Sequence, residues 1–185
     1  MKKSLILFSL LLTTTIASNA QIFQSGSQAF NAGIGFGVPG YYDGSMRLPS
    51  FLASYDHGIL HKLGIGYLGV GGQTGFQFTK DKYAHHVTGN YYEEYSHTYF
   101  LLGARATYHF AFYDMTKEPI FRDLDVYAGI VAGFKVDFTD GPVSHSGALH
   151  NVFAGARYLF SDGFGVYAEL GYDVAYLNLG VTFDF

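Results

Sequence analysis

Cysteine is absent from the sequence. This absence excludes disulfide bonds, thiolate metal sites and a lipid-modified cysteine anchor. Basic charge is also scarce, with 11 Lys and Arg against 15 Asp and Glu and a formal net charge of −4. A chain of this charge gives no reason to expect nucleic acid as a partner. After residue 20 no segment is apolar enough for a membrane helix, and no long stripe of helical period is present.

The first twenty residues have the features of a targeting segment. A short basic start, "MKK", precedes the apolar run "LILFSLLLTTTIA", and Ser18 and Ala20 supply the small residues that a signal peptidase needs. A membrane anchor is the alternative, but the run is shorter than the ~20 apolar residues that span a bilayer. We therefore predict a cleaved signal peptide at 1–20, export of the chain, and one mature domain over 21–185.

What the mature sequence does contain is glycine, aromatic residues and alternating apolar patterns. With 24 glycines and 18% aromatic residues, an exported chain is either a soluble β-sandwich or a transmembrane β-barrel. Apolar residues recur at every second position, the period of a strand, in eight segments. These segments are 29–38, 49–57, 62–72, 96–110, 124–138, 150–160, 164–173 and 176–185. Segment 62–72 has apolar residues on both faces, so its orientation is ambiguous.

Three features favour the barrel. The charged faces also carry tyrosines, Phe153 and many glycines, which suit a crowded interior better than a solvent face. Aromatic residues recur at the ends of the apolar faces, as in the two girdles of a membrane barrel. Short and long connections alternate, except that the long connection 111–123 falls on the short-turn rim. We predict an all-β, eight-stranded antiparallel transmembrane up-and-down β-barrel with both termini on one rim and a lumen that side chains can fill.

A set of charged residues shares the predicted inward faces. These residues are Arg105, Asp125, Lys135, Asp137, Arg157 and Glu169. A three-residue loop, 162–164, with Gly163 in the left-handed conformation, would place Arg157 directly opposite Glu169. We interpret the set as a paired lumen charge network that holds a narrow barrel together, because buried charges need partners. The alternative is a gated or ion-selective path.

The motifs "GARYLF", "GFGVYAELGY" and the ending "YLNLGVTFDF" resemble small outer-membrane β-barrel proteins of Gram-negative bacteria, the OmpA-like and OmpX-like group, in their Bacteroidota-type form. The resemblance implies localisation in the cell outer membrane. It also implies that the alternating ending of Val181, Phe183 and Phe185 is the signature recognised by the outer-membrane assembly machinery.

Two kinds of chemistry have candidate residues in the loops. A metal could be bound by imidazoles and carboxylates at His85, His86, His97, His145, Glu93 and Glu94, but no fixed ligand spacing is present. Ser144 to Ser146 reads "SHS" and pairs a nucleophile type with a base type, as in barrels that modify lipid A, but no motif singles out that chemistry. We therefore predict no metal, no cofactor and no enzymatic activity.

The functional prediction is a monomeric barrel with a polar, side-chain-filled lumen and a structural or surface-interaction role in the envelope. Its expected partners are outer-membrane lipids, the assembly machinery and a surface ligand bound through the tyrosine-rich residues 75–97. A narrow porin-like channel for ions or small solutes is the alternative. A lipid A-modifying enzyme at the rim is a third and weaker hypothesis.

Overall fold

The computed structural model describes residues 23–37, 46–47, 49–85, 91–138, 146–161, 163–172 and 174–185, and at 46–47, 80–85 and 91–95 it describes only the backbone. The predicted signal peptide, 1–20, lies outside the described residues. The eight long strands are β1 (Gln28–Phe36), β3 (Ser50–Gly58), β4 (Gly66–His85), β5 (Tyr91–Phe110), β6 (Leu124–Asp137), β7 (Gly147–Ser161), β8 (Phe164–Gly171) and β9 (Leu177–Asp184). A two-residue strand, β2 (Met46–Arg47), pairs with β4.

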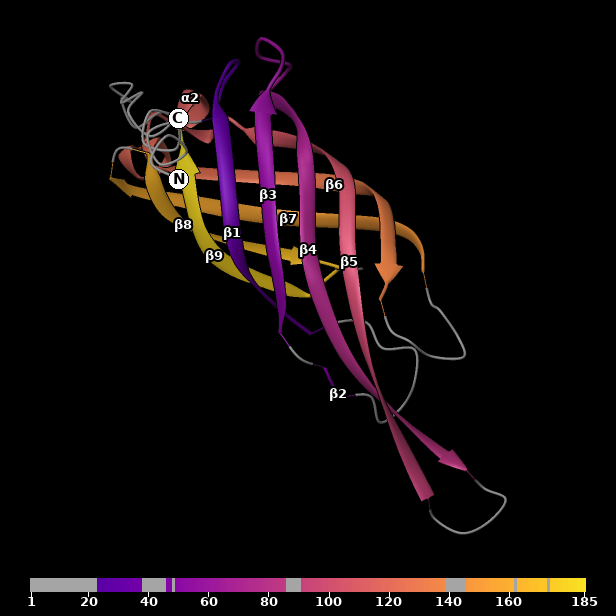
Figure 1. The fold of residues 1–185 in the computed structure, drawn as a ribbon. Helices are drawn as coiled ribbons and strands as arrows, with labels where there is room; N and C mark the ends of the chain where they lie inside the picture. Colours follow the sequence, from indigo (N-terminus) through magenta and orange to yellow (C-terminus); the bar gives the residue numbers. More distant parts are fainter. Residues whose placement is uncertain are drawn as a thin grey trace, which may run out of the picture.

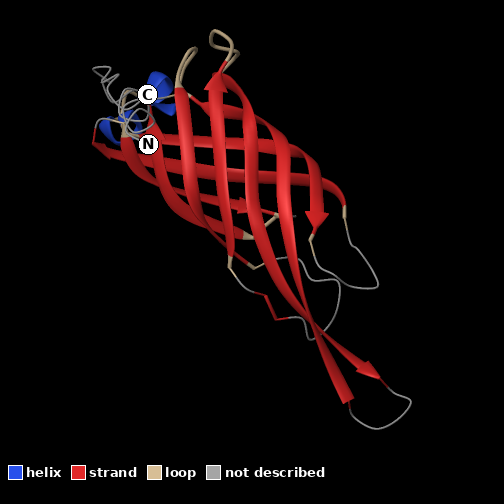
Figure 2. Ribbon diagram, in the orientation of Figure 1, coloured by secondary structure: helices blue, strands red, loops and turns tan. Residues whose placement is uncertain are grey.

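The long strands form a closed ring (Figures 1 and 2). Each pairs antiparallel with the next long strand in sequence, and the ring closes where β9 pairs with β1. The predicted fold class, an eight-stranded antiparallel up-and-down barrel, is confirmed. Two short helical elements, α2 (Phe112–Thr116) and η1 (Pro119–Arg122), lie in the connection from β5 to β6. Within the described part of the chain, no helix has the length and apolarity to cross a membrane.

The last residue belongs to the closing ladder rather than to a frayed end. The Phe185 N–H donates to the Gln28 carbonyl at 2.9 Å, and the Gln28 N–H donates to the Phe185 carbonyl at 3.1 Å. The chain therefore begins and ends its barrel at the same rim, beside α2 (Figure 1). The connection 111–123 lies at this rim, as the sequence predicts, and its length is used by α2 and η1.

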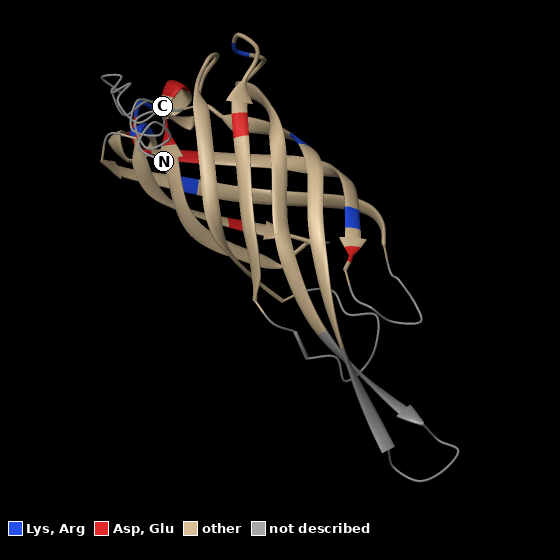
Figure 3. Cartoon of the chain, in the orientation of Figure 1, with Lys and Arg blue, Asp and Glu red and all other residues tan. Residues whose placement is uncertain are grey.

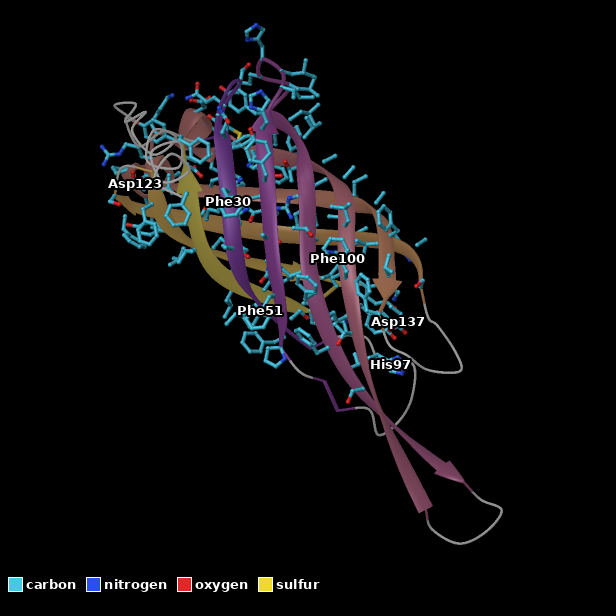
Figure 4. The ribbon with its side chains drawn as sticks, viewed as in Figure 1. Phe30, Phe51, His97, Phe100, Asp123 and Asp137 are labelled. Atoms are coloured by element: carbon cyan, nitrogen blue, oxygen red, sulfur yellow. The ribbon has the colours of Figure 1, made fainter. Side chains whose placement is uncertain are left out.

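The barrel has its apolar side chains outside and its polar side chains inside. Leu179 and Phe183 are 43% and 41% exposed, whereas Arg157 is 0% exposed. Outward rows include Phe30, Ile34, Phe51, Phe76, Leu102, Ile130, Val152, Phe160, Val166 and Leu170, of which Figure 4 labels Phe30 and Phe51. A soluble sandwich would bury these rows and expose the charges. The distribution matches a barrel whose outer face meets hydrocarbon.

Aromatic rings gather at both ends of the apolar faces. At the short-turn rim, the Phe164 ring lies 5.1 Å from the rings of both Phe160 and Phe183. At the opposite end, the ring centroids of Phe76 and Phe100 lie 5.4 Å apart. Rings at the two boundaries of an apolar band are the girdles of membrane barrels.

Strands β4 and β5 continue beyond the other strands as a paired hairpin (Figure 1). Each has 20 residues, about twice the number that a tilted strand needs to cross a bilayer. Part of the sequence predicted as a long loop is therefore a continuation of the strands. The ambiguity of segment 62–72 is also resolved: the strand starts at Gly66, Val70 faces outward at 40% exposure, and Gln73 faces inward at 5%.

Substituting an arginine on the outer face tests whether the protein is a membrane barrel or a soluble protein. Val152 lies within β7 and is 69% exposed. In bilayers, Val152→Arg should lower the free energy of unfolding by about 2–4 kcal/mol, because the charge would enter hydrocarbon. Urea titration of the lipid-reconstituted protein measures this loss. A change within about 0.5 kcal/mol, the usual effect at a solvated surface, would contradict the assignment.

Candidate functional site: the closed lumen

Charged side chains from several strands meet inside the lumen. Of the six charged residues predicted to share the lumen, Arg105, Asp125, Arg157 and Glu169 belong to one buried network. The wall itself carries few charges along its length (Figure 3). The network thus gathers, inside the lumen, charged residues that come from different strands.

Arg105, on β5, bridges two carboxylates across the lumen. Its Nε donates to Asp56 Oδ1 at 2.8 Å and its Nη2 donates to Glu169 Oε1 at 2.5 Å. Its Nη1 donates to Gln73 Oε1 at 3.1 Å, and its guanidinium carbon lies 4.0 Å from the centre of the Phe153 ring. Because the three contacted strands, β3, β4 and β8, lie on both sides of β5 in the ring, this one side chain ties distant parts of the wall together.

Arg157, on β7, forms the second centre. Asp125 is its direct cross-strand neighbour on β6, and its carboxylate lies 3.0 Å from Arg157 Nη2. Asp56 and Asp184 follow at 3.8 and 3.6 Å. Asp56 therefore contacts both arginines, which makes the two centres one network. Charges this deep are stable only because each has an opposite charge beside it.

Aromatic and hydroxyl groups add further contacts to the network. The Tyr127 hydroxyl donates to Glu169 Oε1 at 2.8 Å, and the Arg157 guanidinium carbon lies 4.7 Å from the Tyr127 ring centre. His109 places Nδ1 2.9 Å from Asp125 Oδ2 and Nε2 2.9 Å from Thr107 Oγ1. With both ring nitrogens engaged, the imidazole of His109 has a fixed orientation.

Phe23 lies against the charged network at the short-turn rim. Its ring is 1% exposed and stacks on the His109 ring with 3.6 Å between centroids and 15° between planes. The turn behind it is fixed by main-chain bonds from Gly26 N–H to the Gly58 carbonyl, 2.8 Å, and from Gly58 N–H to the Ser27 carbonyl, 2.9 Å. The segment before β1 therefore covers the charged network with an aromatic ring. The sequence does not predict this position for Phe23, because no periodic pattern marks the residue.

Glycines on the inner face leave room for the large polar side chains. A Cβ added to Gly155 would lie 2.7 Å from the Tyr127 ring and 2.8 Å from Glu169 Cγ. An eight-stranded barrel is only wide enough for side chains to fill. The many glycines of the inward rows are explained by this crowding rather than by a phosphate-binding loop.

The predicted pairing of Arg157 with Glu169 is wrong by two residues. Glu169 opposes Gly155, and Arg157 opposes Tyr167. The register shifts between Leu159 and Ser161, so the hairpin is tighter than a three-residue loop would make it. Gly163 does adopt the left-handed conformation, with φ at 74°. Glu169 instead pairs with Arg105 across the lumen, and Arg157 pairs with Asp125 on β6, its neighbour strand on the side away from β8.

Lys135 and Asp137 lie apart from the network, nearer the long-loop end. The Asp137 carboxylate, at the end of β6, is buried and lies 3.1 Å from Nδ1 of His97, which lies within β5; Figure 4 labels both residues. Lys135 Nζ lies 5.8 Å from the centre of the Tyr99 ring. The six predicted residues therefore form one network of four and a separate pair of positions.

For most of the candidate metal ligands, and for Ser144 and His145 of the catalytic candidate, the structure describes no side chain. This applies to the side chains of His85, His86, His145, Glu93, Glu94 and Ser144. Among the side chains that are described, no three His, Asp or Glu come together as a metal site.

A water-sized cavity remains in the lumen beyond Glu169. Its polar lining comes from Gln73, Asn151, Glu169 and Asn178. The Asn178 Oδ1 atom is buried and has no hydrogen-bond partner among the described residues. The space suits an ordered water molecule better than a solute.

The predicted assembly signature lies on the outer face of the closing strand. Phe183 and Phe185 are exposed, and Val181 pairs with Ala32 of β1 and Val166 of β8. The alternate residues Thr182 and Asp184 face the lumen side. Recognition of this ending by the assembly machinery stays a prediction.

The fold and its enclosed charges define a transmembrane-type β-barrel with a polar interior. The chain is similar to the N-terminal β-barrel domain of Pseudomonas aeruginosa OprF, with 16% identity, a TM-score of 0.46, and 88% of this chain and 99% of that chain covered. It is also similar to Ail, the attachment invasion locus protein of Yersinia pestis solved with the heparin analogue sucrose octasulfate, with 15% identity, a TM-score of 0.43, and coverage of 87% and 99%. Neither supports the Bacteroidota-type resemblance. No protein-family model and no curated protein matches the sequence.

Removal of one member of the network leaves the others as uncompensated buried charges. Arg105→Leu should cost about 3–5 kcal/mol of unfolding free energy, because Asp56 and Glu169 lose their shared partner. Adding Glu169→Gln should recover part of this loss. Arg122→Leu, at an exposed rim position, is the matched control and should change stability by less than about 0.5 kcal/mol. Equal effects of Arg105→Leu and Arg122→Leu in urea titrations would show that the network is not buried.

Proposed function

We propose that this chain is an exported outer-membrane barrel with a closed lumen, which acts as a monomeric structural and surface-interaction protein of the envelope. The observation that supports it most is the inverted distribution of side chains, with apolar rows outside and an ion network inside. Such a molecule is stable only when a bilayer covers its outer face. The proposed role is non-enzymatic, and its membrane partners are the surrounding lipids and the assembly machinery.

A closed lumen is favoured over a conducting one by two features. The arginine–carboxylate network occupies the cross-section at Arg105 and Arg157, where both side chains are almost completely buried. Phe23 then covers the network at the short-turn rim. An ion entering there would have to displace the ring and break charge pairs in a low-dielectric interior.

The surface-interaction part of the proposal rests on the hairpin of β4 and β5. Its strands stay paired as far as His85 and Tyr91, well beyond the ends of the neighbouring strands. In a barrel whose short turns face the periplasm, this hairpin extends outward from the cell. The sequence of 75–97 is rich in tyrosine, a residue enriched at interfaces. The hairpin would hold these residues away from the bilayer on a regular backbone.

Conductance across planar bilayers separates the closed barrel from the narrow channel. The wild-type protein should show no stepwise current. Phe23→Ala should produce small, intermittent steps, because the ring that covers His109 and Arg157 is removed. Phe160→Ala, which removes an outward-facing ring, is the matched control and should remain silent. Regular steps from the wild-type protein would support the channel and contradict a closed lumen.

Shortening the hairpin tests the surface role. Replacement of residues 80–96 by an Asn-Gly turn joins the paired residues Thr79 and His97 and should leave the barrel folded, because the ladder below the replaced part is complete. Folding is checked by the different gel mobility of boiled and unboiled protein extracted from outer membranes. Cells that carry the shortened protein should lose retention on a glycan array and on wells coated with matrix proteins. A control with Tyr83, Tyr91, Tyr92 and Tyr95 changed to serine keeps the length. Retention equal to wild type in both variants would reject the surface role.

A further inference from the structure

The short-turn rim carries a surface that is unusually apolar for connecting segments. It consists of the β3–β4 turn, residues 59–65, and the β5–β6 connection, residues 112–123, which we call the rim platform. Six of its apolar side chains are between 43% and 63% exposed. They are Ile59, Leu60, Leu63, Ile65, Met115 and Ile120. Scattered single apolar residues need no explanation, but a cluster of this kind marks an interaction surface.

The two parts of the rim platform are fastened together. Lys62 Nζ lies 2.8 Å from Asp114 Oδ2, and this hydrogen bond lowers the pKa of the Asp114 carboxyl. The Ala111 N–H donates to the Ile65 carbonyl at 2.9 Å, and the Tyr108 hydroxyl donates to the Leu63 carbonyl at 2.6 Å. The turn and the connection therefore present one surface.

This surface is continuous with the lipid-facing wall of the barrel. The Ile59 N–H donates to the Leu68 carbonyl at 3.0 Å, so the β3–β4 hairpin runs on into the rim platform. On the other side, Phe110 at the end of β5 stacks on Phe112 with 5.7 Å between centroids. Phe112 in turn lies 5.5 Å from Phe121 of η1. A series of rings thus leads from the aromatic girdle to the outer end of the connection.

The charges of the rim platform balance. The platform has three basic residues, Lys62, Lys117 and Arg122, and three acidic residues, Asp114, Glu118 and Asp123. Two acidic residues lie close to basic partners: Asp114 is 2.8 Å from Lys62 and 3.7 Å from Lys117, and Asp123 is 3.3 Å from Arg122. The surface has neither the excess positive charge that would select anionic lipid nor the excess negative charge that would select a basic protein. An occupant with an apolar body and no net charge fits it.

We propose that the rim platform is an interfacial anchor, which inserts its apolar side chains at the boundary between headgroups and acyl chains in the leaflet on the short-turn side. The occupant is a zwitterionic phospholipid surface, with the charged side chains at the headgroups. The centre of the Tyr113 ring lies 5.3 Å from Lys117 Nζ. Tyrosine has the amphipathic character of a residue at the membrane interface. The anchor would fix the depth and tilt of the barrel. This inference rests on the proposed function, because it requires a membrane-embedded wall.

The absence of cysteine allows single labels to be placed without background. Four variants are spin-labelled in phosphatidylcholine bilayers: Ile120→Cys and Leu60→Cys at apolar positions of the rim platform, Glu118→Cys at an exposed charged position of the same platform, and Val152→Cys on the wall. Collisions with oxygen, which concentrates in hydrocarbon, are compared with collisions with a water-soluble nickel chelate. The ratio of oxygen to nickel collisions should be several-fold higher at Ile120→Cys and Leu60→Cys than at Glu118→Cys, and highest at Val152→Cys.

Each other outcome has a distinct meaning. If Val152→Cys reports oxygen while Ile120→Cys and Leu60→Cys match Glu118→Cys, the wall is embedded and the rim platform is not, so only the anchor is overturned. If Val152→Cys itself reports water, the proposed function fails together with the anchor. Adding phosphatidylglycerol should leave the ratios unchanged. Insertion that appears only with this anionic lipid would overturn the neutral occupant inferred from the balanced charges.

Discussion

Closure of the hydrogen-bonded ring is the constraint on which the rest of the molecule depends. A sheet whose outer face meets hydrocarbon has no solvent for an unpaired edge, so β9 must pair with β1. The exchange of hydrogen bonds between Gln28 and Phe185 extends that pairing to the last residue of the chain. Closure in turn fixes which side chains face lipid and which share a narrow interior, because alternate residues of a strand point to opposite faces.

The interior then sets its own conditions. Two arginines and their carboxylates cannot be hydrated inside a barrel this narrow, so they neutralise one another, with Asp56 shared between Arg105 and Arg157. Small inward residues such as Gly155 leave space for Tyr127 and Glu169. The Phe23 ring stacks on His109 at one end of the network. The side chains in the lumen therefore connect strands on different sides of the barrel. The apolar outer face and the enclosed charges both follow from the closed ring, in which alternate side chains point outward and inward.

Local alternation was enough to predict the eight strands, the common rim of the termini and, except in segment 62–72, the inward faces of the strands. It was not enough to predict partners within the lumen. Arg105 meets Glu169 across the barrel, on strands that are not neighbours, and such contacts depend on the stagger of the whole ring rather than on any local spacing. The irregular pairing at Leu159 and Ser161 moved the expected Arg157 pair by two residues. Phe23 precedes the first alternating segment, so periodicity carried no signal for it.

Nuclear Overhauser spectroscopy of the protein in lipid nanodiscs tests most directly whether the apolar side chains face lipid and the charged ones are enclosed. Contacts between acyl-chain protons and side-chain methyls should appear for Val152, Leu179 and Val181. The guanidinium protons of Arg105 and Arg157 should exchange slowly with water and show no acyl contact. Acyl contacts missing from Val152 and Leu179, together with rapid solvent exchange at the two guanidinium groups, would contradict the inverted barrel.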